Sequence, residues 1–245
     1  MNLIIDIGNT RVKAGLFEKN ELKNSFVFES MDELFSVNLF STFRITNCII
    51  ASVASPIESF INQLKEKCKV LVFTSETPTP LKNLYQSANT LGSDRLASAV
   101  GGNFLFPNKN ILVIDAGTCI KYNFVNSSNE YIGGAISPGL QMRFKALHTF
   151  TSRLPLLKSD ENYNTLIGTS TNESILSGVE MGALAEMQGF IEQYKILYPD
   201  ICIFLTGGDG NFFEKRLKKP IFADSFLILK GLNVILDYNL NAFSI

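Results

Sequence analysis

The sequence predicts an α/β protein made of two similar halves, each a sheet with helices, with a ligand cleft between them. Two observations support this prediction. A short apolar segment that ends in Asp and a glycine turn occurs twice, as LIIDIGNTRVK at 3–13 and as LVIDAGTCIK at 112–121. After each copy the chain continues with short strands and then with alternating helices and strands. The 245 residues are enough for one large domain or two small ones.

The first half is predicted to contain three tightly joined strands, a helix, a buried strand, a second helix and a further strand. Capping boxes, in which Glu follows Ser three residues later, predict the starts of both helices at Ser30 and Ser55. Pro56 at the first helical position supports the second start. The predicted elements cover 3–7, 11–17, 22–28, 30–40, 48–53, 55–67 and 70–73.

The second half is predicted to repeat this order, with domains at 1–105 and 106–245. Its long helix carries an apolar stripe, and Pro199 ends it. Three glycines in this helix, Gly178, Gly182 and Gly189, each cost up to about 1 kcal/mol relative to alanine. They suggest close backbone approach to another element or to a second subunit. The predicted elements cover 111–115, 119–125, 131–136, 171–198, 201–205, 211–217 and 226–239.

Composition argues against several classes of function. A formal net charge of −1 gives no electrostatic reason to expect nucleic acid or an anionic membrane as a partner. No apolar segment approaches the roughly 18 residues of a membrane helix, and the N-terminus lacks the pattern of a signal peptide. We therefore expect a cytoplasmic protein with reduced thiols. The single histidine, His148, makes triad hydrolases and histidine-based metal sites poor candidates.

The two matching turns predict a phosphate site. Asp6 and Asp115 each end an apolar segment, and each is followed by glycine and threonine. Glycine allows a tight turn and lets a ligand oxygen approach backbone amides. A carboxylate repels phosphate, so we expect it to hold a cation against the phosphates. The alternative is that each Asp caps its own turn. That alternative is favoured for a single copy, whereas two copies favour a polyphosphate held from both sides.

A third glycine-rich turn, FLTGGDG at 204–210, ends an apolar strand and leads into a helix. Glycines there leave room for a large group such as adenosine, and a helix N-terminus favours anions. Such a turn is a weak signal alone. Its position after two Asp-Gly turns strengthens the prediction of a nucleotide site.

Two phosphate motifs followed by an adenosine motif resemble the superfamily of actin, sugar kinases and heat-shock chaperone ATPases. Within it, the chain is similar to type III pantothenate kinases over nearly its whole length. The resemblance implies duplicated ribonuclease-H-like (actin-like ATPase) domains and ATP-dependent phosphorylation of pantothenate to 4'-phosphopantothenate, the first step of coenzyme A biosynthesis. GSDR and ISPG distinguish this family within the superfamily. The matching segments are DIGNTRVK at 6–13, GSDR at 92–95, DAGT at 115–118, GGAISPGLQMR at 133–143 and TGGDG at 206–210.

The resemblance also implies roles for individual residues and a homodimer. Asp94 is expected to accept the proton of the substrate hydroxyl, in a reaction that otherwise needs positioning and charge neutralisation. Asp6 is expected near Mg²⁺, directly or through water, and Asp115 at a monovalent cation, K⁺ or ammonium. The implied ATP contacts are Asp6, Ile7, Gly8, Asn9, Thr10, Arg11, Val12, Lys13, Thr118, Gly207 and Gly208, and the implied pantothenate contacts are Tyr85, Gly92, Ser93, Asp94, Arg95 and Thr171.

Several alternatives remain open at this point. Ser93 or Asp94 could only cap the helix expected at 96–104, and Thr171 could belong to a capping box at 170–173. Many relatives carry Thr and Asp where this chain has Lys121 and Asn123. Lys121 could replace or weaken the cation at Asp115, or point away along its strand. The rival functions are a non-catalytic nucleotide-binding regulator, another small-molecule kinase and a filament-forming actin relative.

Overall fold

The computed structural model describes residues 1–52, 58–217 and 220–242. Its contacts divide the chain into two compact units. The first comprises Met1–Asn108, Val125–Gly133 and Phe226–Ile245, and the second comprises Lys109–Phe124 and Gly134–Ser225. The C-terminal segment thus belongs to the first unit, whereas the predicted domain 106–245 placed it in the second.

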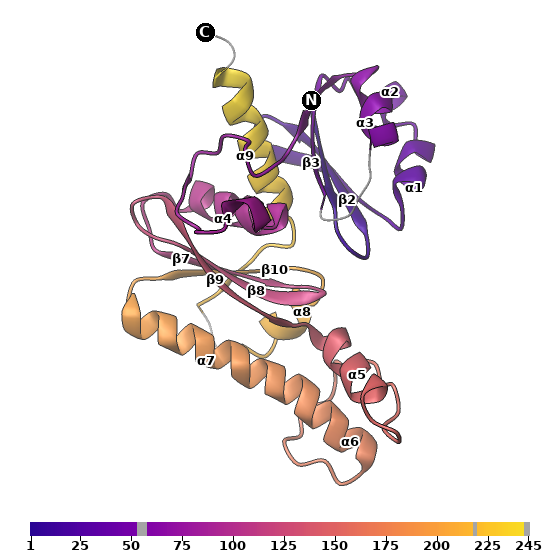
Figure 1. The fold of residues 1–245 in the computed structure, drawn as a ribbon, viewed down its shortest axis with the longest axis vertical. Coiled ribbons are helices and arrows are strands. Elements are labelled where there is room, and N and C mark those ends of the chain that lie inside the picture. Colours follow the sequence, from indigo (N-terminus) through magenta and orange to yellow (C-terminus); the bar gives the residue numbers. More distant parts are fainter. Residues whose placement is uncertain (53–57, 218–219, 243–245) are drawn as a thin grey trace. The chain divides into compact units, whose positions relative to one another are not determined.

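The first unit contains a five-stranded sheet with the strand order β3-β2-β1-β4-β5 (Figure 1). β1, β2 and β3 form the predicted antiparallel meander, and β4 and β5 run parallel to β1. Every residue of the central strand β1 is buried, so Asp6 lies at the end of a covered strand. The strands are β1 (Asn2–Ile7), β2 (Val12–Glu18), β3 (Glu21–Phe28), β4 (Asn47–Ser52) and β5 (Lys69–Val72).

The helices of the first unit follow the predicted order with two differences. The side chain of Ser30 caps the first helix as predicted, but an extended backbone at Val37 splits the predicted helix 30–40 in two. The start of the capping box predicted at 55–58 lies outside the described residues. The helices are α1 (Met31–Ser36), α2 (Leu39–Thr42), α3 (Glu58–Lys65), α4 (Ser93–Leu105) and α9 (Leu227–Ala242), with a 3₁₀ turn at Ala88–Thr90.

Helices α4 and α9 approach each other closely because both carry glycine at the contact. A Cβ on Gly101 would lie 2.4 Å from the carbonyl oxygen of Leu227. A Cβ on Gly231 would lie 1.8 Å from the carbonyl oxygen of Ala97. Neither position can therefore accept a side chain without separating the helices, so this packing fixes α4 against α9.

The second unit repeats the topology of the first. The sheet that contains its strands has the order β11-β10-β7-β8-β9-β6, and β9-β8-β7-β10-β11 corresponds to β3-β2-β1-β4-β5. The edge strand β6 pairs with Glu130 and Tyr131 of β9, and these residues belong to the first unit. β10 runs parallel to β7 just as β4 runs parallel to β1. The duplication predicted from the two matching segments is confirmed. The strands are β6 (Lys82–Asn83), β7 (Ile111–Ala116), β8 (Cys119–Val125), β9 (Glu130–Pro138), β10 (Cys202–Thr206) and β11 (Phe222–Ala223).

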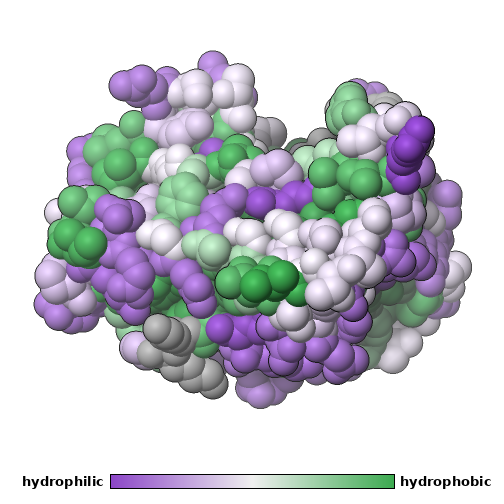
Figure 2. Space-filling model, turned by 90° about the horizontal axis from the view of Figure 1, so that it is seen from below, coloured by the Kyte–Doolittle hydropathy of each residue, from purple (hydrophilic) through white to green (hydrophobic). Residues whose placement is uncertain are grey.

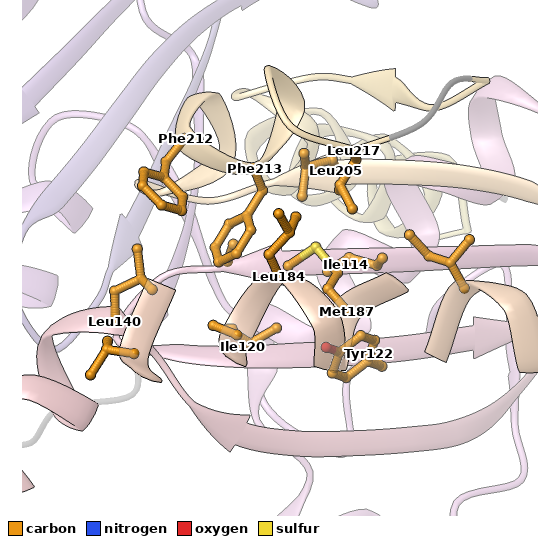
Figure 3. Packing of buried hydrophobic residues seen from close by; sticks show 14 of the residues in the cluster. Ile114, Ile120, Tyr122, Leu140, Leu184, Met187, Leu205, Phe212, Phe213 and Leu217 are labelled. Atoms are coloured by element: carbon orange, nitrogen blue, oxygen red, sulfur yellow. The ribbon is translucent and has the colours of Figure 1, made fainter. Parts of the chain in front are cut away.

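The predicted long helix 171–198 is helical throughout but changes geometry in the middle. It comprises α6 (Thr171–Leu176), a π-helical segment (Ser177–Met181) and α7 (Gly182–Leu197). α7 lies along one face of the second sheet (Figure 1). Leu184 and Met187 of α7 pack in one apolar cluster with Ile114 and Phe213 (Figure 3). The remaining helices are α5 (Leu140–Thr149) and α8 (Gly210–Glu214).

The surface seen in Figure 2 mixes hydrophilic and hydrophobic residues, and the hydrophobic ones form small patches. Among the described residues no helix is both long enough and apolar enough to cross a membrane.

Candidate functional site

The first predicted phosphate turn joins β1 to β2. Asp6 is 8% exposed at the end of β1, and the backbone N–H of Gly8 donates to the carbonyl oxygen of Arg11 at 3.0 Å. Lys13 lies directly opposite Asp6 in the β1–β2 register, so the two side chains share one face of the sheet. Asn9, Thr10 and Arg11 are exposed at the tip of the turn. The turn therefore offers a carboxylate and an ammonium on one face of the sheet, beside three exposed residues.

The second turn, between β7 and β8, has the same construction with one residue fewer. Asp115 is 5% exposed at the corresponding position of β7. The N–H of Gly117 donates to the carbonyl oxygen of Cys119 at 3.0 Å, as Gly8 does to Arg11. Thr118 is exposed at the tip, in the place predicted for an ATP contact.

Lys121, which corresponds to Lys13 in the repeat, turns toward the carboxylate of its own unit. Its Nζ donates to Oδ2 of Asp115 at 2.9 Å, and the two side chains are 18% and 7% exposed. The interpretation that Lys121 points away along the strand is therefore wrong.

The third motif lies beside the second turn. Thr206 at the end of β10 pairs with Asp115, and the N–H of Asp209 donates to the carbonyl oxygen of Ala116 at 2.9 Å. Gly207 has φ +99°, and a Cβ there would lie 2.2 Å from the oxygen of Ala116. Glycine is therefore required at 207. The next glycine, Gly208, is exposed and has open space around it. The carboxyl ends of the adjacent strands β7 and β10 thus bring Asp115, predicted to bind a cation, close to Gly207 and Gly208, predicted to contact the nucleotide.

The ISPG motif supports the second turn. The N–H of Gly139 donates to the carbonyl oxygen of Thr118 at 3.1 Å, and a Cβ on Gly139 would lie 2.2 Å from the oxygen of Gly117. The backbone after β9 can therefore touch the turn only because residue 139 is glycine. Helix α5 begins directly afterwards, at Leu140.

Glu186 of α7 holds this motif in place, and the sequence analysis did not predict it. Its carboxylate accepts hydrogen bonds from Ser137 and from Nη2 of Arg143, the latter at 2.6 Å. Burial opposes ionisation, but the hydrogen bonds from Arg143 and Ser137 outweigh it and lower the pKa of Glu186. The sequence held one signal for it. Arg143 ends the segment GGAISPGLQMR, and an arginine there needs a carboxylate partner from elsewhere in the chain.

The GSDR segment forms the start of α4 in the first unit. Gly92 occupies the N-cap position without a side-chain cap, and Ser93 and Asp94 are the first two helical residues. The interpretation that Ser93 or Asp94 serves only as the cap is therefore wrong. Oδ1 of Asp94 accepts from the N–H of Arg95 at 2.8 Å, and the Asp94 side chain is partly exposed.

Ser93 presents a hydroxyl that the described protein does not use. Its Oγ is buried and has no hydrogen-bond partner among the described residues. It lines a small cavity together with polar and apolar side chains from the segments around it. A buried hydroxyl without a partner costs free energy, so its placement favours a ligand that supplies the partner. The other lining residues are Phe73, Thr74, Ser75, Asn83, Ala88, Leu91 and Leu96.

Arg95 of α4 lies against the ring of Tyr85. Arg95 is 5% exposed, and its guanidinium carbon lies 5.3 Å from the ring centre of Tyr85. Hydrogen bonding from Arg95, aided by its charge, lowers the pKa of Tyr85. Gly133 has φ +133°, and a Cβ there would lie 3.1 Å from the tyrosine ring. The structure thus brings together Tyr85, Arg95 and the start of α4, all predicted as substrate contacts.

The remaining predicted substrate residue, Thr171, belongs to the second unit. It is the exposed first residue of α6, and Ser170 is the N-cap, with its Oγ accepting from the N–H of Glu173 at 3.3 Å. The predicted capping box thus has Ser170 as its cap, and the Thr171 side chain is not that cap.

The chain matches type III pantothenate kinases over nearly its whole length. The family model described as type III pantothenate kinase matches residues 2–193. The type III pantothenate kinase of Bacteroides fragilis is 47% identical over 241 residues, which are 98% of each chain. That of Flavobacterium johnsoniae is 40% identical over 243 residues, covering 98% of this chain and 99% of its own.

Solved structures with lower identity share the fold. A protein from Campylobacter jejuni described as a Baf family transcriptional activator matches with a TM-score of 0.63 and 21% identity, over 98% of this chain and 99% of its own. A ROK family glucokinase from Streptomyces griseus, solved with glucose and AMPPNP, matches with a TM-score of 0.54 and 12% identity, over 97% and 98%. The predicted actin-like, sugar-kinase type of fold is confirmed.

Proposed function

Because the chain belongs to the type III pantothenate kinase family, we propose that it transfers the γ-phosphate of ATP to the primary hydroxyl of pantothenate. The observation that carries the proposal is the group of Tyr85, Ser93, Asp94 and Arg95 in the first unit. This group combines a partly exposed carboxylate, a buried guanidinium and a buried hydroxyl that has no hydrogen-bond partner within the described part of the chain. The product would enter the synthesis of coenzyme A.

We assign ATP to the residues of the three turns. Asp6, Ile7, Gly8, Asn9, Thr10, Arg11, Val12 and Lys13 form the first phosphate loop, and Thr118 contributes from the second. The exposed Gly208 suits the adenosine, because a side chain there would occupy open space, and Gly207 allows the tight turn beside it. Lys13 supplies positive charge on the same face as Asp6.

The residues at the first turn fit a divalent cation. Carboxylate oxygen is a preferred ligand of Mg²⁺, and Asp6 is nearly buried beside a turn of exposed residues. Asp6 would hold the ion, directly or through water, and the ion would neutralise phosphate charge when bound. The predicted monovalent cation, K⁺ or ammonium, has a poorer fit at Asp115, because Lys121 already occupies Oδ2 of that carboxylate.

We propose that Asp94 accepts the proton of the pantothenate hydroxyl. Its position at the second residue of α4 fixes its backbone, and its Oδ1 is oriented by the N–H of Arg95. The guanidinium of Arg95 would bind the pantothenate carboxylate, which suits its planar donor geometry. The hydroxyls of Ser93 and Tyr85 would complete the substrate contacts of this group, and Thr171 stays a predicted contact.

The test is ADP release with Mg-ATP, with and without pantothenate, for the wild type and for Asp94→Asn. We expect release that requires pantothenate and falls by roughly 10²–10⁴-fold in the variant, the usual contribution of a general base. Asp32→Asn is the matched control, because Asp32 is also the second residue of a helix, α1, and is exposed. ATP binding without turnover in the wild type would contradict the proposal and favour the regulator.

We also propose that the protein is a homodimer. Gly178, Gly182 and Gly189 are exposed, and a Cβ on any of them would meet nothing within 4 Å among the described residues. Nothing described in the chain therefore requires these glycines. A second subunit that packs against the π-helical segment and α7 would explain their cost. A cytoplasmic location stays a prediction.

A further inference from the structure

The second phosphate turn contains a cation of its own. Lys121 projects from β8 toward the end of β7, where its Nζ lies 2.9 Å from Oδ2 of Asp115. The lysine side chain is 18% exposed and the aspartate side chain 7% exposed. A pair this poorly exposed is screened far less by solvent and salt than an ion pair on the surface.

The surroundings of Asp115 hold its carboxylate in one place. Lys121 contacts Oδ2 of Asp115, and a Cβ on Gly207 would lie 2.6 Å from the other oxygen, Oδ1, so the backbone of the third motif is close to that oxygen. Thr206 pairs with Asp115 through the parallel β10–β7 register. One carboxylate oxygen thus contacts the ammonium, and the backbone approaches the other.

A nearly buried carboxylate needs a positive charge beside it. A bound monovalent cation would supply one such charge, and the ammonium of Lys121 supplies the same charge through a covalent tether. A second cation at this carboxylate would be repelled by the ammonium. The pair therefore fills the role predicted for a free cation.

We propose that the ammonium of Lys121 takes the place of a monovalent cation at Asp115, so that phosphate transfer proceeds without K⁺ or ammonium ion. The proposal rests on the kinase function proposed above. Lys121 is a positioning residue: its ammonium holds the Asp115 carboxylate in place, and Asp115 in turn borders Gly117 and the backbone of Gly207.

The first experiment measures pantothenate-dependent ADP release in buffers of equal ionic strength, with K⁺, ammonium or tetramethylammonium as the sole monovalent cation. The wild type is expected to keep kcat/KM within about twofold across the three buffers. A fall of about tenfold or more in tetramethylammonium overturns the proposal.

The second experiment uses Lys121→Thr, which removes the ammonium and leaves room for an ion. K⁺ and ammonium are expected to raise both its melting temperature and its kcat/KM, whereas tetramethylammonium is too large to enter. Lys215→Thr is the matched control. Lys215 forms a pair at 3.0 Å with Glu161 in the same unit, but both side chains are more than half exposed. This control is expected to show no response to K⁺ beyond that of the wild type.

Melting temperature separates failure of this proposal from failure of the kinase function. If no buffer supports pantothenate-dependent turnover, the kinase function fails, and the K⁺ response of the Lys121→Thr melting temperature still tests the cation site. A Lys121→Thr protein that folds, with no K⁺ response in stability or activity, overturns the proposal. If that variant does not fold, the wild-type series across the three cations decides.

Discussion

Replacing Gly207 by alanine is expected to destabilise the protein strongly, because two costs coincide at one residue. The backbone has φ +99°, a conformation that costs a non-glycine residue about 1–3 kcal/mol. The new methyl would also lie 2.2 Å from the carbonyl oxygen of Ala116, which already accepts from Asp209. Such overlap typically costs about 1–3 kcal/mol. The sum is about 2–6 kcal/mol.

The assay is thermal and urea unfolding of Gly207→Ala beside Gly208→Ala. For a chain of this length, each kcal/mol lowers the melting temperature by roughly 2–4 °C. Gly208 has open space and an ordinary φ, so its variant should stay within about 0.5 kcal/mol of the wild type. Mg-ATP binding should weaken in both variants, because the methyl in Gly208→Ala enters space assigned to the nucleotide. Equal stability of the two variants would refute the argument from the backbone.

Two further predictions concern α7. Burial raises the pKa of Glu186, but the hydrogen bonds from Arg143 and Ser137 lower it further, to below its ordinary value of 4.5. The ionised Glu186 therefore stabilises the fold above about pH 4.5, and this stabilisation is lost as pH falls through the lowered pKa. The difference in melting temperature between the wild type and Glu186→Gln should therefore shrink below about pH 4.5. The same difference for Glu192→Gln, at an exposed residue of α7, should not shrink in this way. A constant difference for Glu186→Gln would contradict the assigned ionisation. Gly182→Ala is expected to weaken self-association in sedimentation equilibrium at micromolar concentration, and an unchanged dimer, or a wild-type monomer, would contradict the proposed packing.

Local features of the sequence predicted most of the fold. The two Asp-Gly turns, the strand order that follows each of them and the cap at Ser30 depend on short-range patterns, and the structure contains all three. The return of α9 to the first unit depends on contacts between residues far apart, through Gly101 and Gly231. The sequence analysis placed the boundary between the halves after residue 105, a few residues beyond Gly101. Paired glycines that let two helices touch give the same local signal as glycines in a linker.

Residues of the candidate site were likewise predictable where they belong to a local motif, and not where they depend on distant contacts. Motif residues such as Asp115 and Asp94 could be identified because their neighbours in the sequence form the motif. Glu186 could not, because its partners Ser137 and Arg143 lie more than forty residues away. The direction of Lys121 also needed the structure, since a strand residue two positions after a turn can face either side of the sheet.

The measurement that tests the central claim most directly is identification of the product. Wild-type protein with Mg-ATP and pantothenate would be followed by mass spectrometry and phosphorus NMR, with ADP measured in parallel. The account predicts one pantothenate phosphorylated on its primary hydroxyl for each ADP released, and no ADP without pantothenate. ATP hydrolysed to inorganic phosphate with pantothenate unchanged, or ATP bound with no turnover, would contradict it.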